Sequence, residues 1–190
     1  FLQKYINILS DSDIDGLAGV IDYDSEDTSF EEYLNNANRG LKQYKSKEVL
    51  PIGHILFGNC AIQTKLLKLA GGFNQKLDGY GGEEVELLYR INKQHYLKIT
   101  KINAIVLRYD HPDFNTHCKR LTKFGSTNFK SLPFSIKKNI IPGFLLKLSV
   151  MLPISLLYYI SVYIKDNILG DNFIMMRIVM GLSILNGYKS

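Results

Sequence analysis

Tryptophan is absent from the 190 residues, and cysteine, histidine and proline are scarce, at two, four and five residues. The two cysteines, Cys60 and Cys118, lie far apart and outside any Cys-x-x-Cys arrangement. This usage excludes a disulfide framework and a cysteine-rich zinc site, and it suits a reducing cytosol. The sequence starts at Phe1, without an initiator methionine or a recognisable signal peptide. Its length is enough for one domain with a sizeable core.

Acidic side chains are missing from one long segment of the chain. Residues 114–165 contain eight Lys and Arg residues and no Asp or Glu, whereas residues 1–113 carry a net charge of −3. A basic block beside an apolar run predicts contact with an anionic membrane surface rather than with nucleic acid. A solvated basic face is the alternative, and it is the usual role of a charge run.

Within this segment, residues 148–164 form a run of 17 uncharged positions. A membrane-spanning helix needs about 20 residues, with about 17 as the lower limit. Pro153 weakens a spanning helix, while the tyrosines of the run and the lysines at its ends suit a membrane interface. We expect a helix on the cytoplasmic side of the membrane, as a peripheral or short membrane anchor. A short span and a helix packed against another part of the protein are the alternatives.

The pattern of apolar residues predicts an α/β fold. Helices are expected where apolar residues recur at spacings of three and four, and strands where β-branched and apolar residues alternate or run together. A Ser-x-x-Glu capping box at Ser29 predicts the start of one helix. The expected helices cover residues 1–9, 29–43, 65–70, 83–94 and 115–124, with further helices from 136 broken at Pro142 and Pro153. The expected strands cover residues 17–21, 59–63, 96–100 and 104–109.

The stretch Gly71–Arg90 reads GGFNQKLDGYGGEEVELLYR and joins two glycine-rich turns to an acidic helix start. Glycines on both sides of Tyr80 predict a tight loop whose backbone approaches another group closely. Carboxylates at Glu83 and Glu84 are favoured in a first helical turn by the helix dipole. On these grounds alone, the acidic pair is an ordinary helix start.

The order of these residues adds a second interpretation. Gly-Gly-Phe, a polar spacer, Gly-Tyr-Gly-x, an acidic pair, and x-Glu-Leu before an arginine resemble the C-terminal catalytic segment of GT-A glycosyltransferases. The similarity is greatest to the family 2 enzymes and the galactosyltransferase C-terminal domain, over residues 57–111. It implies that residues 1–132 are the C-terminal portion of a GT-A (nucleotide-diphospho-sugar transferase) domain. Residues 133–190 would then be an apolar, helical, membrane-associating tail. The nucleotide-binding half, with its Asp-x-Asp metal motif, would precede Phe1.

The resemblance also implies an activity. It is the metal-dependent, inverting transfer of a hexose from a nucleotide-diphosphate sugar, with UDP the expected nucleotide. The acceptor would be a sugar hydroxyl of a glycan or lipid-linked sugar, in a growing polysaccharide or glycolipid. Such a transfer needs a carboxylate base beside the acceptor. The family's second acidic residue supplies it, here Glu84, while Glu83 contacts the acceptor or shapes the loop. The family more often has Asp at the position of Glu84, and often Trp at that of Gly82.

His111 lies 27 residues after Glu84, at the end of a predicted strand. In related metal-dependent enzymes a histidine at a similar place completes the coordination of the divalent cation on the donor diphosphate. The resemblance therefore implies that His111 binds Mn²⁺ or Mg²⁺, for which imidazole is a normal ligand. A loop histidine without such a role is the alternative.

The expected substrate-binding residues are Asn59 and the glycine-rich loop. Asn59 lies in a Gly-Asn-Cys-Ala stretch that matches the family's Gly-Asn-x-Ala/Ser, and it is expected to hydrogen-bond a sugar hydroxyl. An asparagine with only a turn role is the alternative. Tyr80, Gly81 and Gly82 complete the expected set.

Two other functions stay open. The segment Asp11–Asp22 nearly matches a calcium-binding loop, D-x-D-x-D-G, although a strand rather than a helix is expected to follow it. An acidic turn is the favoured interpretation of this segment. The second open alternative is a non-catalytic GT-A-like binding module, which keeps the fold without the donor-binding half.

Overall fold

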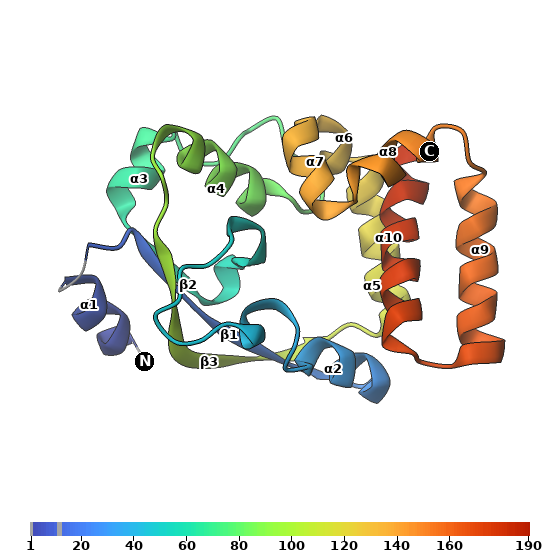
Figure 1. Cartoon of the computed structure of the whole chain (residues 1–190), viewed down its shortest axis with the longest axis horizontal. Coiled ribbons are helices and arrows are strands. Elements are labelled where there is room, and N and C mark those ends of the chain that lie inside the picture. Colours follow the sequence, from blue (N-terminus) through green and yellow to red (C-terminus); the bar gives the residue numbers. More distant parts are fainter. Residues whose placement is uncertain (1, 11–12) are drawn as a thin grey trace. The chain divides into compact units, whose positions relative to one another are not determined.

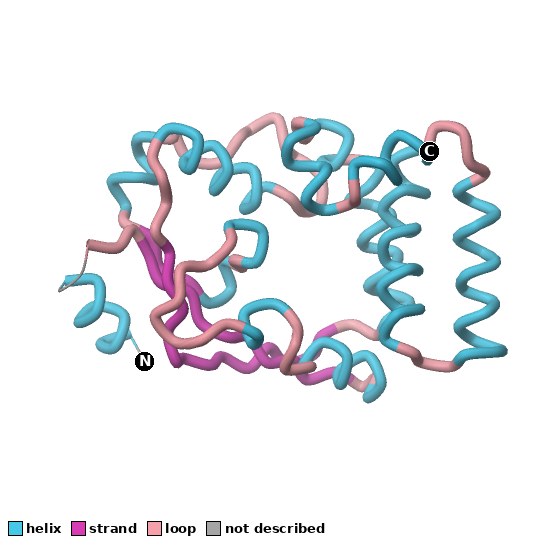
Figure 2. Tube along the Cα trace, viewed as in Figure 1, coloured by secondary structure: helices cyan, strands magenta, loops and turns pink. Residues whose placement is uncertain are grey.

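The computed structural model of the chain describes residues 2–10 and 13–190, and it has a mixed α/β fold (Figures 1 and 2). The chain forms two compact units. The first, here called the sheet unit, consists of Phe1–Ser25, Leu34–Asn74 and Glu84–His111. The second, the helical unit, consists of Glu26–Tyr33, Gln75–Glu83 and Pro112–Ser190.

The sheet unit contains a three-stranded sheet in the order β2-β1-β3. The central strand β1 (Gly16–Ser25) pairs antiparallel with β2 (Cys60–Ile62) and parallel with β3 (Ile99–His111). The strands expected at 96–100 and 104–109 are therefore one strand. Pairing with β1 resumes beyond the expected gap, after a bulge between the pairs Ala18↔Lys101 and Val20↔Ile105.

Opposite faces of β1 bury two different apolar clusters, because successive side chains of a strand point to opposite sides. On one side Leu17 packs with Tyr5 of α1 (Leu2–Ser10) and with two residues of β3. On the other side Ala18 belongs to a larger cluster with α3 (Thr64–Leu69) and α4 (Glu83–Gln94). The buried members of that cluster are Ala18, Leu41, Leu50, Ile55, Leu66, Leu87, Leu88, Ile91, Leu97 and Ile99.

Helix α2 (Thr28–Asn35) is shorter than the predicted 29–43 and begins with a different cap. The carboxylate of Asp27 accepts a hydrogen bond from the Phe30 N–H, 3.0 Å away, in place of the expected capping box at Ser29. At the other end, the Asn35 amide bonds both the N–H and the carbonyl of Tyr23, at 3.0 and 2.7 Å. This tie to β1 fixes the last residue of α2. The chain continues into the short 3₁₀ helices η1 (Gly40–Gln43), η2 (Ile52–His54) and η3 (Phe57–Asn59).

The helical unit is arranged around α10 (Phe173–Lys189), which packs against both α5 (Phe114–Ser126) and α9 (Ile154–Ile164) (Figure 1). Two glycines bring α5 and α10 together. A β-carbon on Gly125 would lie 2.1 Å from the Ile184 carbonyl oxygen, and one on Gly187 would lie 1.9 Å from that of Thr122. Because α5 packs on α10, it belongs to the same compact unit as the C-terminal helices, whereas the sequence predicts a boundary at residue 132.

Short helices lead from α5 into the apolar C-terminal region. They are α6 (Asn128–Ser131), α7 (Phe134–Ile140) and α8 (Gly143–Ser149), and the π-helical turn η4 (Lys165–Leu169) extends α9. The uncharged run 148–164 is divided between α8 and α9, as the break expected at Pro153 requires. No single helix in the described residues combines the length and apolar composition needed to cross a membrane. The pair Gly143–Ser149 and Ile154–Leu169 meets both criteria together, with a bend of 115°.

Candidate functional site

Glu84 is the second residue of α4, and a main-chain group orients its carboxylate. Its Oε2 accepts a hydrogen bond from the Phe57 N–H in η3, at 3.1 Å. The neighbouring thiol of Cys60 is also affected, because burial and then the negative charge of Glu84 raise its pKa to about 12. Cys60 is therefore a neutral thiol at physiological pH and no nucleophile. The candidate base lies in a defined position of the sheet unit.

Glu83 has a different environment from Glu84. Its Oε2 is buried and makes no hydrogen bond with any residue that the structure describes. A buried polar atom of this kind is uncommon and calls for an explanation such as a bound group. The two carboxylates also fall in different compact units, Glu83 with residues 75–83 and Glu84 with residues 84–111.

The loop Gly79–Gly82 has a conformation that only glycine adopts easily. Gly81 and Gly82 have φ angles of +76° and +87°. A β-carbon on Gly82 would also lie 2.8 Å from the ring of Phe124. The tryptophan that GT-A enzymes often carry at this position would therefore not fit here.

Two residues that no sequence motif singles out, Asn128 and Thr127, hold this loop in place. The Asn128 side chain accepts a hydrogen bond from the Gly79 N–H and donates one to the Gly81 carbonyl, both at 2.9 Å. The hydroxyl of Thr127 accepts from the Tyr80 N–H at 3.3 Å. Asn128 is only 2% exposed, whereas the Tyr80 side chain, at 40%, reaches solvent. Asn128 and Thr127 therefore hold the main chain of the loop, while the side chain of Tyr80 stays accessible to solvent.

Glu86 and Arg90 of the motif have a structural role. Their side chains form an ion pair at 2.9 Å on one face of α4. The Arg90 guanidinium also donates to the carbonyls of Ala70 and Gly72, the latter at 2.8 Å. These bonds fix the turn after α3, in which Gly71 and Gly72 have φ angles of +74° and +72°. This accounts for the glycine pair, the glutamate and the arginine without a ligand.

Asn59 is buried, and its amide links three elements of the sheet unit. Its Nδ2 donates to the carbonyls of Val20 and Ala104, at 2.7 and 3.2 Å, while its Oδ1 accepts from the Tyr5 hydroxyl at 2.6 Å. Both amide hydrogens are thus used within the fold. Donation from Asn59 to a sugar would require one of these bonds to break, whereas its Oδ1 accepts one hydrogen bond and has a second lone pair; the predicted bond to a sugar stays a prediction.

His111 ends β3 and is buried against the ring of Tyr23, edge to face, with ring centroids 4.8 Å apart. Within the described residues, no group of three or more His, Cys, Asp or Glu side chains is placed to hold a metal ion. The imidazole alone does not make a divalent-cation site. A metal at His111 would need further ligands that the described residues do not place beside it, and the resemblance implies that they precede Phe1.

In the acidic segment, residues 13–15 form a bend and strand β1 begins at Gly16, while Asp11 and Ser12 lie outside the described residues. The Asp15 carboxylate contacts the His95 ring at 3.0 Å and accepts a hydrogen bond from the Lys98 N–H at 2.9 Å. Asp22 pairs with Lys42 at 2.8 Å. The residues from Gly16 to Asp22 belong to the predicted strand, here β1, whereas in a calcium loop they would still be ligand-bearing loop leading into a helix. These contacts favour the acidic turn.

No protein-family model, curated protein or solved structure matches this chain. The likeness to GT-A enzymes therefore rests on the order of residues in Gly71–Arg90 and on the flanking Asn59 and His111.

Proposed function

We propose that this chain is the C-terminal part of an inverting GT-A glycosyltransferase. It would move a hexose from a nucleotide-diphosphate sugar, with UDP the expected nucleotide, to a sugar hydroxyl of a growing polysaccharide or glycolipid. The supporting observation is the position of Glu84 in the first turn of α4, with one carboxylate oxygen held by the Phe57 N–H. A carboxylate with a fixed orientation is what a general base needs.

In this proposal Glu84 takes the proton of the acceptor hydroxyl as its oxygen attacks the anomeric carbon. The nucleotide diphosphate leaves from the opposite face of the sugar, so the configuration inverts. Glu83 has a buried carboxylate oxygen without a hydrogen-bond partner in the described residues, and it would bond an acceptor hydroxyl. The loop of Tyr80, Gly81 and Gly82, held by Asn128, would present its main chain and one aromatic ring to the substrate.

A bound Mn²⁺ or Mg²⁺ ion would neutralise charge on the leaving diphosphate. His111 would be one ligand of that ion, and the remaining ligands would come from residues that precede Phe1 in the complete enzyme.

The same proposal places the enzyme on the cytoplasmic surface of a membrane, through α9. Of the α9 residues, all of which the structure describes, Ile154 alone is buried. Leu156, Tyr159, Ile160 and Tyr163 are all exposed, and their spacing of three and four puts them on one face of the helix. Such a face, in a segment with basic and no acidic residues from 114 to 165, suits the interface of an anionic membrane.

A transfer assay tests the proposal. Full-length protein would be incubated with Mn²⁺ or Mg²⁺ and a panel of UDP-sugars, with and without a membrane extract as the source of acceptor. We expect UDP release from one donor that rises when acceptor is present. Absence of release with every nucleotide sugar, while the protein remains folded, would contradict the proposal.

A further inference from the structure

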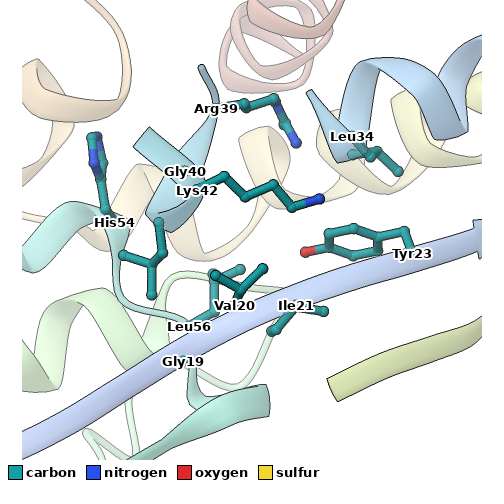
Figure 3. A pocket seen from close by; sticks show the side chains of 11 residues that line it. Gly19, Val20, Ile21, Tyr23, Leu34, Arg39, Gly40, Lys42, His54 and Leu56 are labelled. Atoms are coloured by element: carbon teal, nitrogen blue, oxygen red, sulfur yellow. The ribbon is translucent and has the colours of Figure 1, made fainter. Parts of the chain in front are cut away.

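A small pocket opens in the sheet unit, lined by none of the residues assigned to the proposed transfer step. Its volume is about 60 Å³, and its walls come from β1, from the turn around η1 and from the segment between η2 and Leu56 (Figure 3). Val20, Ile21 and Leu56 supply apolar surface. Because a cavity of about 10–15 Å³ on the same measure already holds one water molecule, the pocket has room for a group of a few heavy atoms.

Two cationic side chains line this pocket. Figure 3 shows Arg39 and Lys42 reaching into it above the ring of Tyr23, whose hydroxyl points into the same space. Lys42 is fixed by Asp22 at 2.8 Å and by the Asn35 side-chain oxygen at 2.9 Å. Asp22 offsets the charge of Lys42, and Arg39 contributes a second cationic side chain to the lining.

The positive charge of Arg39 also affects the pKa of the Tyr23 hydroxyl. Burial raises the pKa of the Tyr23 phenol, and the positive charges of Arg39 and Arg108 oppose that rise. Two guanidinium groups are therefore close enough to act on the hydroxyl. On the far side of the pocket His54 is held by the Tyr44 hydroxyl, 2.8 Å from its Nδ1. Hydrogen-bond donors, a positive charge and apolar surface are thus combined in one small concave site.

We propose that this pocket binds an anionic group, a carboxylate or a phosphate, on the acceptor glycan. The planar guanidinium of Arg39 suits both groups, because it donates two parallel hydrogen bonds to a pair of oxygens. The Tyr23 hydroxyl would donate a further bond, and the apolar residues would contact the sugar ring. The assignment to the acceptor rests on the proposed function, whereas binding of the anion does not. The acceptor would accordingly be an acidic glycan, with uronic acid or sugar phosphate units.

Direct binding to the 190-residue chain tests this inference without any transfer reaction. Glucuronic acid, glucose 6-phosphate, inorganic phosphate and neutral glucose would each be titrated at low ionic strength. Binding would be followed by NMR shifts of residues around the pocket, with sodium chloride as the ionic-strength control. We expect saturable binding of glucuronic acid, of glucose 6-phosphate or of both, and weaker binding of glucose. A preference for glucuronic acid would identify a carboxylate as the ligand, and a preference for the phosphates would identify phosphate.

Three variants make the test specific. Arg39→Gln should weaken binding of the anion about tenfold or more, because it removes a charge-assisted hydrogen bond. Arg120→Gln, the same change at an exposed position of α5, should leave binding unchanged. Leu56 is exposed at the pocket wall, so Leu56→Trp should fill the pocket and abolish binding while the protein stays folded. The inference is overturned if no anion binds beyond the effect of chloride, if glucose binds equally well, or if folded Arg39→Gln binds like the parent.

Discussion

At the scale of single residues, the two members of the acidic pair differ in their hydrogen bonding. Glu84 is oriented by the Phe57 N–H, and Glu83 keeps a buried oxygen without a hydrogen bond in the described residues. A base must hold its orientation toward the acceptor, whereas a substrate-binding group needs an unoccupied acceptor atom. The contacts therefore support the roles that the resemblance implies, with Glu84 as the base.

Glu84→Gln in the full-length enzyme should lower turnover at least about a hundredfold, because general-base catalysis contributes about 10²–10⁴-fold. The affinity for the nucleotide sugar should change little, since the amide keeps the shape of the side chain. Steady-state kinetics with a fixed donor measure both. Glu32→Gln, at an exposed position of α2, is the matched control. Near-normal turnover in Glu84→Gln would refute this assignment, and a larger loss in Glu83→Gln would exchange the two roles.

At the scale of elements, α9 leaves almost all of its apolar side chains unburied, since Ile154 is its one buried residue. An aspartate on its exposed face should prevent insertion into the acyl boundary of a membrane. Ile160→Asp should therefore reduce co-sedimentation with anionic vesicles several-fold. Ile105→Asp, at an exposed isoleucine of β3, is the matched control and should bind vesicles like the parent.

Binding of the parent protein should be weaker to neutral vesicles and partly released by high salt, because salt screens the contribution of the lysines. Failure to sediment with anionic vesicles would contradict membrane association. Truncation after Leu132 would be a poor test, since it removes α10 and exposes the surface of α5 that α10 covers.

The elements that sequence predicted well are those whose signals are local. Helix α4 begins at Glu83 and ends at Gln94 as expected, because its acidic first turn and apolar spacing lie within the helix itself. The end of α2 was missed because it is fixed by bonds between Asn35 and Tyr23, in another element. The predicted gap in β3 was likewise wrong, because pairing with β1 on both sides of a bulge keeps the segment in one strand.

In the candidate site, too, residues with a local sequence signal could be predicted, and residues that act through distant contacts could not. Glu84 could be selected because it lies in a motif of fixed order. Asn128 could not, because its partners Gly79 and Gly81 lie 49 and 47 residues away and nothing near Asn128 signals that contact. The Asn59 side chain is hydrogen-bonded to residues of β1, β3 and α1. The sequence therefore did not show that its amide hydrogens are already used within the fold.

At the scale of the whole molecule, stability should depend on pH through Lys165 in the helical unit. The Lys165 ammonium is buried, 2.9 Å from Asp166 and 3.1 Å from Asp171, and it lies over the ring of Phe114. The hydrogen bond from Lys165 lowers the pKa of Asp171. A carboxyl group with a lowered pKa contributes stability above its ordinary pKa of about 3.9, and this is lost as the pH falls through the folded value.

Asp171→Asn should therefore destabilise the protein at pH 7, by about 1 kcal/mol or less because the carboxylate is nearly half exposed. The difference from the parent should be smaller at pH 2 than at pH 7, because protonation of the parent's carboxyl group removes the charge as the pH falls. Urea unfolding at both pH values measures this, with Asp24→Asn at an exposed position of β1 as the control. An equal difference at pH 7 and pH 2 would show that the charge of Asp171 contributes nothing.

The contact of Gly125 and Gly187 has a consequence for hydrogen exchange. With β-carbon positions 2.1 and 1.9 Å from carbonyl oxygens of the opposite helix, no water molecule fits between α5 and α10 there. The amide hydrogens beside the two glycines should then exchange with deuterium only when the helical unit unfolds, and so be among the slowest in the chain. Gly187→Ala would force the backbones apart, and mass spectrometry of peptides from α5 and α10 should record exchange faster by orders of magnitude. Unchanged protection in that variant would mean that the helices are held together by other contacts.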